Sequence, residues 1–265
     1  MRDFEYHRPG SLEEARERLR AANGGGKLMA GGQSLLPLMK LDLAEPSDVV
    51  SLSGLAELQG IRREGDGVSI GAGSTHTEVA ESDLVRETLP GLAEMAERIG
   101  DPQVRNRGTL GGSVAHADPA ADYPAALVAL EATVITDRRR IPAAEFFLGM
   151  WATALEDDEI ITAVHFPVPD CAAYAKFPNP ASLFALAGVM VARTGGEARV
   201  AVTGAGPGVF RVEEMERRLA EDFRPEAIED VEIDATDLLD DGDASAEYRA
   251  HLVGVMARRA VAECA

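Results

Sequence analysis

Cysteine is scarce in this sequence, and long apolar runs are absent. The two cysteines, Cys171 and Cys264, stand in no CxxC or other metal-ligand spacing, so we expect no thiolate-ligated iron–sulfur cluster and no cysteine-rich zinc site in this chain. Reduced thiols in a cytoplasmic protein are the simplest interpretation. No run of about 18 apolar residues occurs, and the N-terminus has no apolar signal region, so we expect neither a membrane span nor a secretory signal.

Basic residues are also in the minority. The 26 lysines and arginines face 45 aspartates and glutamates, which gives a formal net charge of −19. Because nucleic-acid binding needs patches of Lys and Arg, this charge argues against a nucleic-acid partner. The length of 265 residues, 46% of them hydrophobic, is enough for one large domain or two modest ones.

The hydrophobic patterns alternate between helical and strand-like periods, which predicts an α+β protein. Ser11 and Glu14 predict a capping box at the start of the first helix. Pro167 and Pro169 end a strand and suggest a domain boundary near residue 170. The expected helices are 12–22, 90–99, 123–130, 142–147, 212–220 and 245–262, and the expected strands are 27–30, 48–52, 68–72, 132–136 and 160–166, followed by a hairpin of 183–192 and 198–204.

The most informative stretch is DPQVRNRGTLGGSVAHADPAAD, residues 101–122. We interpret it as a backbone loop that faces a polar ligand, with glycines in conformations that other residues avoid. The segment AGGQS, residues 30–34, has the same design as TLGGS, residues 109–113. Consecutive glycines can turn several backbone N–H groups to one side, so two such loops would suit a diphosphate. Two ordinary tight turns are the alternative.

Three polar residues follow the second glycine segment. His116, Asp118 and Asp122 have no standard metal-ligand spacing, so hydrogen bonding to a polyhydroxyl ligand is the favoured interpretation. The alternatives are an aspartate that caps the helix at 123 and a buried histidine with its own partners. The segment GAGPG, residues 204–208, lacks the G-x-G-x-x-G spacing of a dinucleotide fingerprint and is interpreted as a turn.

The segments AGGQSLLPLMKL (30–41) and IGDPQVRNRGTLGGSVAHADPAADYPAAL (99–127) resemble the FAD-binding medium subunit of molybdenum hydroxylases, the family of carbon monoxide dehydrogenase, aldehyde oxidase and xanthine dehydrogenase. The similarity extends almost end to end. It implies an FAD-binding domain of the vanillyl-alcohol oxidase (PCMH) type over residues 1–170, in subdomains of about 1–54 and 55–170. A small C-terminal α+β domain of the CO dehydrogenase flavoprotein type would follow over 171–265.

The resemblance also implies a set of cofactor contacts, with no metal ligand and no catalytic acid or base among them. In the family's pattern, Phe184 stands where a tyrosine is common, and Asp101 stands where a histidine is common. The implied FAD-binding residues are Ala30, Gly31, Gly32, Gln33, Ser34, Leu35, Thr109, Gly111, Gly112, Ser113, Asp118, Asp122, Ile160, Lys176 and Phe184.

The resemblance finally implies a role in electron transfer. An iron–sulfur small subunit would pass electrons from a molybdopterin large subunit to FAD in this chain, and an external acceptor would take them away. The expected assembly is a hetero-oligomer, a dimer of heterotrimers. Two alternatives remain at this point: a stand-alone flavin oxidoreductase of the same fold, and a non-catalytic assembly subunit.

Overall fold

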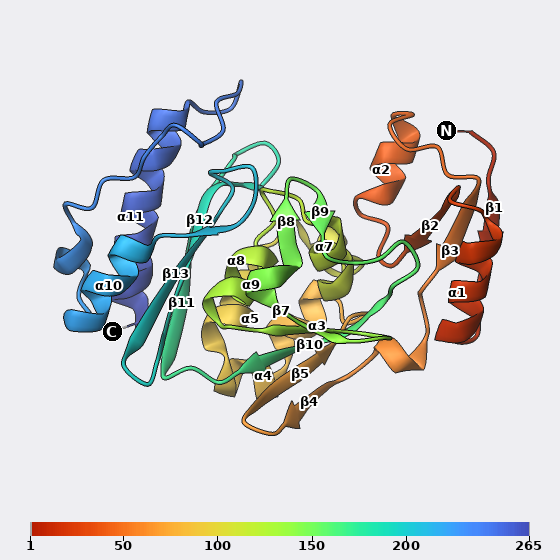
Figure 1. Ribbon diagram of the computed structural model, residues 1–265, viewed down its shortest axis with the longest axis horizontal. Coiled ribbons are helices and arrows are strands. Elements are labelled where there is room, and N and C mark those ends of the chain that lie inside the picture. Colours follow the sequence, from red (N-terminus) through yellow and green to blue (C-terminus); the bar gives the residue numbers. More distant parts are fainter. Residues whose placement is uncertain (1, 265) are drawn as a thin grey trace.

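The computed structural model describes residues 2–264 and shows three parts side by side (Figure 1). The first is a parallel three-stranded sheet in the order β1-β3-β2, accompanied by two helices. Its elements are β1 (Glu5–His7), α1 (Leu12–Ala21), β2 (Gly26–Met29), α2 (Leu35–Lys40) and β3 (Asp48–Ser51). The first glycine segment is therefore the connection from β2 to α2.

Helix α1 starts as the sequence indicates, but only half of the predicted capping box forms. The Ser11 hydroxyl accepts a hydrogen bond from the Glu14 N–H at 3.2 Å. The Glu14 carboxylate accepts from the N–H of Gly10, at 2.8 Å, and not from Ser11. The helix buries Ala15 and Leu19.

The middle part is an antiparallel sheet in the order β4-β5-β10-β6-β7, packed with short helices. The strands are β4 (Ile61–Glu64), β5 (Gly67–Gly71), β6 (Thr133–Thr136), β7 (Arg140–Pro142) and β10 (Ile161–Pro167), and β8 (Phe147–Gly149) pairs separately with β9 (Ala152–Thr153). The helices are η1 (Ala56–Leu58), α3 (His76–Glu81), α4 (Asp83–Thr88), α5 (Pro90–Glu97), α6 (Pro102–Arg105), α7 (Leu110–His116), α8 (Tyr123–Ala129) and α9 (Ala143–Phe146).

The last part is an antiparallel four-stranded sheet in the order β11-β12-β13-β14 with helices at its outer side. Its elements are β11 (Cys171–Pro178), β12 (Ala185–Thr194), β13 (Glu197–Thr203), β14 (Phe210–Arg211), α10 (Glu213–Glu221), η2 (Pro225–Ile228) and α11 (Ala246–Cys264). β12 is buried at eight consecutive positions because both of its faces are covered. Met190 and Ala192 pack into the core of the middle part, whereas Val189 and Val191 pack into the core under α11.

Two expectations from the sequence were wrong, and one strand was not predicted. The segment TLGGS is not a loop, because its glycines lie in the first turn of α7 after Thr109. β11 was not predicted, since its alanines carry little strand propensity. Cys171 and Cys264 are joined in a disulfide that ties the start of β11 to the end of α11, so they give no support to a reducing compartment. Of the helices within residues 2–264, none has the length and apolarity to cross a bilayer.

Candidate functional site

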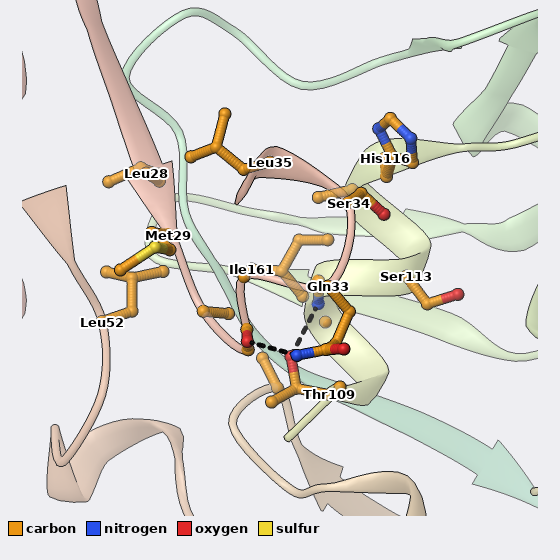
Figure 2. Close-up of a pocket in the computed structure, with 18 of the residues that line it drawn as sticks. Leu28, Met29, Gln33, Ser34, Leu35, Leu52, Thr109, Ser113, His116 and Ile161 are labelled. Atoms are coloured by element: carbon orange, nitrogen blue, oxygen red, sulfur yellow. Dashed lines mark hydrogen bonds between the residues drawn. The ribbon is translucent and has the colours of Figure 1, made fainter. Parts of the chain in front are cut away.

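A cavity of about 1000 Å³ lies where the three parts meet, and both glycine segments line it. Figure 2 shows Gln33 and Ser34 on the first segment near Thr109, which precedes α7, and near Ser113 and His116 on α7. Every residue implied as an FAD contact lines this cavity except Lys176.

The two glycine segments touch through their backbones. A Cβ atom placed on Gly31 would lie 2.0 Å from the carbonyl oxygen of Arg107 and 2.8 Å from the Cα of Gly108. The next residue, Gly32, has a φ of +75°, in the left-handed region. Each glycine therefore has its own steric reason: Gly31 permits the close approach, and Gly32 turns the chain toward α2.

The first segment carries a row of unused hydrogen-bond donors. Among residues 2–264, no group accepts a hydrogen bond from the backbone N–H groups of residues 31–35. The segment's own bonds involve other atoms: the Gln33 side-chain amide donates to the Gly31 carbonyl at 3.3 Å, and the Leu36 N–H donates to the Gly32 carbonyl at 3.1 Å. Consecutive free amides can bind an anion when they point to the same side of the chain.

The second segment has a different construction. The N–H of Leu110 donates to Ser74, that of Gly111 to Ala72, and those of Gly112 and Ser113 to the hydroxyl and carbonyl of Thr109. The expected second cradle of free amides is therefore absent in residues 110–113.

Close approach explains the glycines of α7, since neither of them has a positive φ. A Cβ on Gly111 would lie 2.8 Å from the Ala72 carbonyl oxygen, and one on Gly112 would lie 2.9 Å from the Thr109 hydroxyl oxygen. The second segment can offer a ligand the hydroxyl groups of Thr109 and Ser113. Its two glycines add a part of the cavity wall that has no side chains.

The two aspartates after α7 have separate roles in the fold. Asp118 accepts a hydrogen bond from the Ala120 N–H at 2.8 Å and lines the cavity. Asp122 is buried, accepts the Tyr174 hydroxyl, and pairs with the Lys176 ammonium at 3.0 Å. Burial raises the pKa of Asp122, and the nearby Lys176 opposes that shift.

Lys176 reaches the cavity only through this pair. Its side chain is 4% exposed, and its second hydrogen bond goes to the Arg98 carbonyl at 3.4 Å. Asp122 occupies the N-cap position of α8, but its side chain makes no capping bond, so the alternative interpretation as a helix cap is wrong.

Aromatic side chains stand exposed at the edge of the cavity. Phe184, in the loop between β11 and β12, is 49% exposed, and Trp151, between β8 and β9, is 60% exposed. Ile160 also lines the cavity but is buried, and its N–H donates to the Asp137 carboxylate at 2.9 Å.

Comparison with known proteins decides the family. The family described as "FAD binding domain in molybdopterin dehydrogenase" matches residues 2–169, and "CO dehydrogenase flavoprotein C-terminal domain" matches residues 172–264. The chain belongs to this flavoprotein family. The predicted boundary near residue 170 stays a prediction; it lies in the short gap between the two matched ranges.

Full-length relatives of this flavoprotein are similar over nearly the whole chain. It is 38% identical to the carbon monoxide dehydrogenase medium chain of Hydrogenophaga pseudoflava, over 97% of this chain and 96% of that one. It is 37% identical to the nicotine 6-hydroxylase medium subunit of Paenarthrobacter nicotinovorans, with the same two coverages. Reconstituted CO dehydrogenase from Oligotropha carboxidovorans superposes with a TM-score of 0.90 at 34% identity, covering 99% of this chain and 98% of that one. These matches confirm the α+β flavoprotein fold.

Two residues in the cavity wall of this flavoprotein, Trp151 and His76, were not predicted. Trp151 is the sole tryptophan, and its rarity was the available signal. His76 lies against Gly108, packs against the Tyr123 ring and has a buried Nδ1 with no hydrogen-bond partner among residues 2–264. Burial, aided by the charge of Arg105, lowers the pKa of His76 to about 4, so the ring is neutral at pH 7.

Proposed function

We propose that this chain is the FAD subunit of a molybdenum hydroxylase. In this proposal it receives electrons from an iron–sulfur small subunit, which is served by a molybdopterin large subunit, and passes them to an external acceptor. Bound FAD would supply the redox chemistry, accepting and releasing electrons through its ring system. The family membership supports the cofactor, and the medium-chain relatives support the subunit role.

The row of five unpartnered amides at residues 31–35 is the observation that carries the proposal. A diphosphate placed there would receive several hydrogen bonds from groups that are already fixed, without the cost of ordering them. Thr109 and Ser113 face the same cavity and add hydroxyl groups. The volume of about 1000 Å³ suits an extended dinucleotide.

The wall of the cavity suggests where the two ends of the cofactor lie. We place the diphosphate between the glycine segments and the flavin ring toward Ile160, Phe184 and Trp151. The ring would then lie near the aromatic edge of the cavity, where a partner protein can approach. Asp122 and Lys176 would act on the ring as a neutral ion pair, since each compensates the charge of the other.

The sole tryptophan gives a direct test. FAD added to the purified apo chain should quench the fluorescence of Trp151 until a single site is saturated, because the indole stands at the cavity edge. FMN, which lacks the second phosphate and the adenosine, should bind much more weakly. A Trp151→Phe control should lose the signal while flavin absorbance still shows binding. Equal affinity for FAD and FMN would contradict the placement of the diphosphate.

A second experiment addresses the partners. Purification from the native host should recover an iron–sulfur chain and a molybdenum chain together with this one, in a dimer of heterotrimers. Recovery of a lone flavoprotein with substrate turnover would favour the stand-alone oxidoreductase, and recovery without flavin would favour the assembly subunit. A cytoplasmic location belongs to the same proposal.

A further inference from the structure

One wall of the cavity is a segment without regular structure. Residues 154–160 connect β9 to β10, and Leu155, Glu156, Asp157, Glu159 and Ile160 all line the cavity. A loop in this place has no sheet or helix hydrogen bonds to fix it. A few backbone hydrogen bonds hold it, such as that from the Ala154 N–H to the Phe146 carbonyl at 2.9 Å and that from the Glu159 N–H to the Glu156 carbonyl at 3.0 Å, and side chains supply the other contacts.

The Glu159 carboxylate is at the centre of these side-chain contacts. One of its oxygens accepts from the Thr136 hydroxyl at 2.8 Å and from Arg139 Nε at 2.9 Å. The other accepts from Arg139 Nη2 at 2.8 Å and from the N–H of Glu156 at 3.0 Å. The same Arg139 Nη2 donates to the Ala154 carbonyl at 2.7 Å. The loop thus curls around one carboxylate and one guanidinium group.

Neighbouring contacts tie the loop to two other segments of the chain. Asp137 and Ile160 exchange two hydrogen bonds, from the Asp137 N–H at 3.0 Å and from the Ile160 N–H at 2.9 Å. Asp158 pairs with Arg138 and, at 2.6 Å, with Arg20 of α1. The loop is therefore held between the turn 137–139 and the first helix.

Burying a carboxylate costs free energy, so the position of Glu159 needs a physical explanation. The side chain of Glu159 is 0% exposed, and replacing a buried ion pair with apolar residues is often neutral or stabilising in proteins. What the apolar replacement cannot do is bind both ends of an irregular loop at once. Glu159 does this from a position next to Ile160, which faces the proposed flavin.

We infer that Glu159, clamped by Arg139, is a positioning residue that fixes the loop 154–160 in the shape that receives the flavin ring. This inference rests on the proposed FAD site. Glu159 acts through Ile160 and the loop backbone and takes no part in electron transfer itself.

The chain contains a matched control for the same kind of ion pair. Glu216 accepts the N–H of Val200 at 2.9 Å and is clamped by Nε and Nη2 of Arg211 in the C-terminal part. Side-chain exposure is similar in the two pairs, 0% and 45% for Glu159 and Arg139 against 7% and 38% for Glu216 and Arg211. Glu216 does not line the cavity.

The experiment compares Glu159→Gln with Glu216→Gln in the full chain. In each variant an amide replaces the carboxylate. The amide NH₂ group then faces N–H and O–H donors from which the carboxylate oxygen accepted hydrogen bonds, so these bonds are lost. We measure unfolding by denaturant, the FAD dissociation constant, and the visible circular dichroism of the bound flavin. Both variants should lose stability, but only Glu159→Gln should weaken FAD binding, by about tenfold, and change the flavin spectrum.

Each outcome has a definite meaning. Equal FAD affinity and equal spectra for Glu159→Gln and Glu216→Gln would overturn the inference while leaving the FAD site intact. A wild-type chain that binds no FAD would instead overturn the proposed function. If Glu159→Gln does not fold, Arg139→Gln and its counterpart Arg211→Gln decide the question by the same measurements, because both arginines are partly exposed.

Discussion

The contact between the two glycine segments can be tested with a single methyl group, in the variant Gly31→Ala. The new Cβ would lie 2.0 Å from the carbonyl oxygen of Arg107 and 2.7 Å from its carbonyl carbon. Both atoms belong to the backbone, so no side-chain rotation can relieve the clash. Since nonbonded contacts of this kind need roughly 3.5 Å, the segments must separate by more than about 1 Å.

Two consequences follow from a displacement of that size. Overpacking of a buried contact lowers the free energy of unfolding by about 1–3 kcal/mol. The amides of residues 31–35 also move relative to α7, and binding sites tolerate only about 0.5 Å of such error. We expect FAD affinity to fall by about 100-fold or more, because misplacement by 1 Å has effects of that order.

The assay is FAD titration by Trp151 fluorescence alongside denaturant unfolding, with Gly54→Ala as control. Gly54 also lines the cavity and has a φ of +87°, but a Cβ there meets no atom within 4 Å. The control therefore loses about 1–2 kcal/mol from backbone strain with no clash between the segments. If Gly31→Ala binds FAD as tightly as Gly54→Ala does, the proposed coupling between the two segments is refuted.

Three further predictions concern charge and cross-linking. The free energy of unfolding should fall by up to about 3 kcal/mol as the pH falls from 6.5 toward 4, because in this range only the unfolded chain protonates His76. His76→Phe should flatten this part of the pH–stability profile. Cys264→Ser, which opens a loop of 93 residues, should lower stability by about 4–5 kcal/mol and abolish the effect of reductant on Tm. Asp122→Asn leaves the buried Lys176 ammonium without its counter-charge and should cost about 3–5 kcal/mol in denaturant unfolding, part of which the added Lys176→Met restores.

The sequence predicted those parts of the site that depend on neighbouring residues in the chain. It did not predict those that depend on contacts between distant residues. The segments at 30 and 109 were found because each places a glycine pair beside a residue with a short hydroxyl side chain. Their convergence is confirmed, yet the helix at Thr109 was missed because a glycine pair has poor helix propensity. The close approach of Gly111 to Ala72, which requires glycine there, is a tertiary contact and leaves no local signal.

Buried charges show the same limit. Lys176 was assigned to the cofactor, but its ammonium group pairs with Asp122, which lies 54 residues earlier in the chain. In the sequence, nothing distinguishes Glu159 from the other acidic residues, of which there are 45 in total. Its burial follows from contacts with the turn at 137–139, which lies 20 residues away in the chain. The hydrogen bonds and the Arg139 charge lower the pKa of Glu159 to about 2, which marks it as a fixed carboxylate.

The C-terminal sheet completes the cavity. The Thr203 hydroxyl lies 2.9 Å from the Pro119 carbonyl and 2.6 Å from that of Ala121, and the Gly204 N–H donates to Pro119 at 2.8 Å. These bonds hold the chain between the two aspartates that follow α7, while β11 supplies the partners of Asp122. The glycine segments offer donors to a diphosphate, but the segment from 117 to 122 has no sheet of its own. Residues beyond 170 therefore contribute to the proposed cofactor site, because their hydrogen bonds help to fix the wall at 117–122.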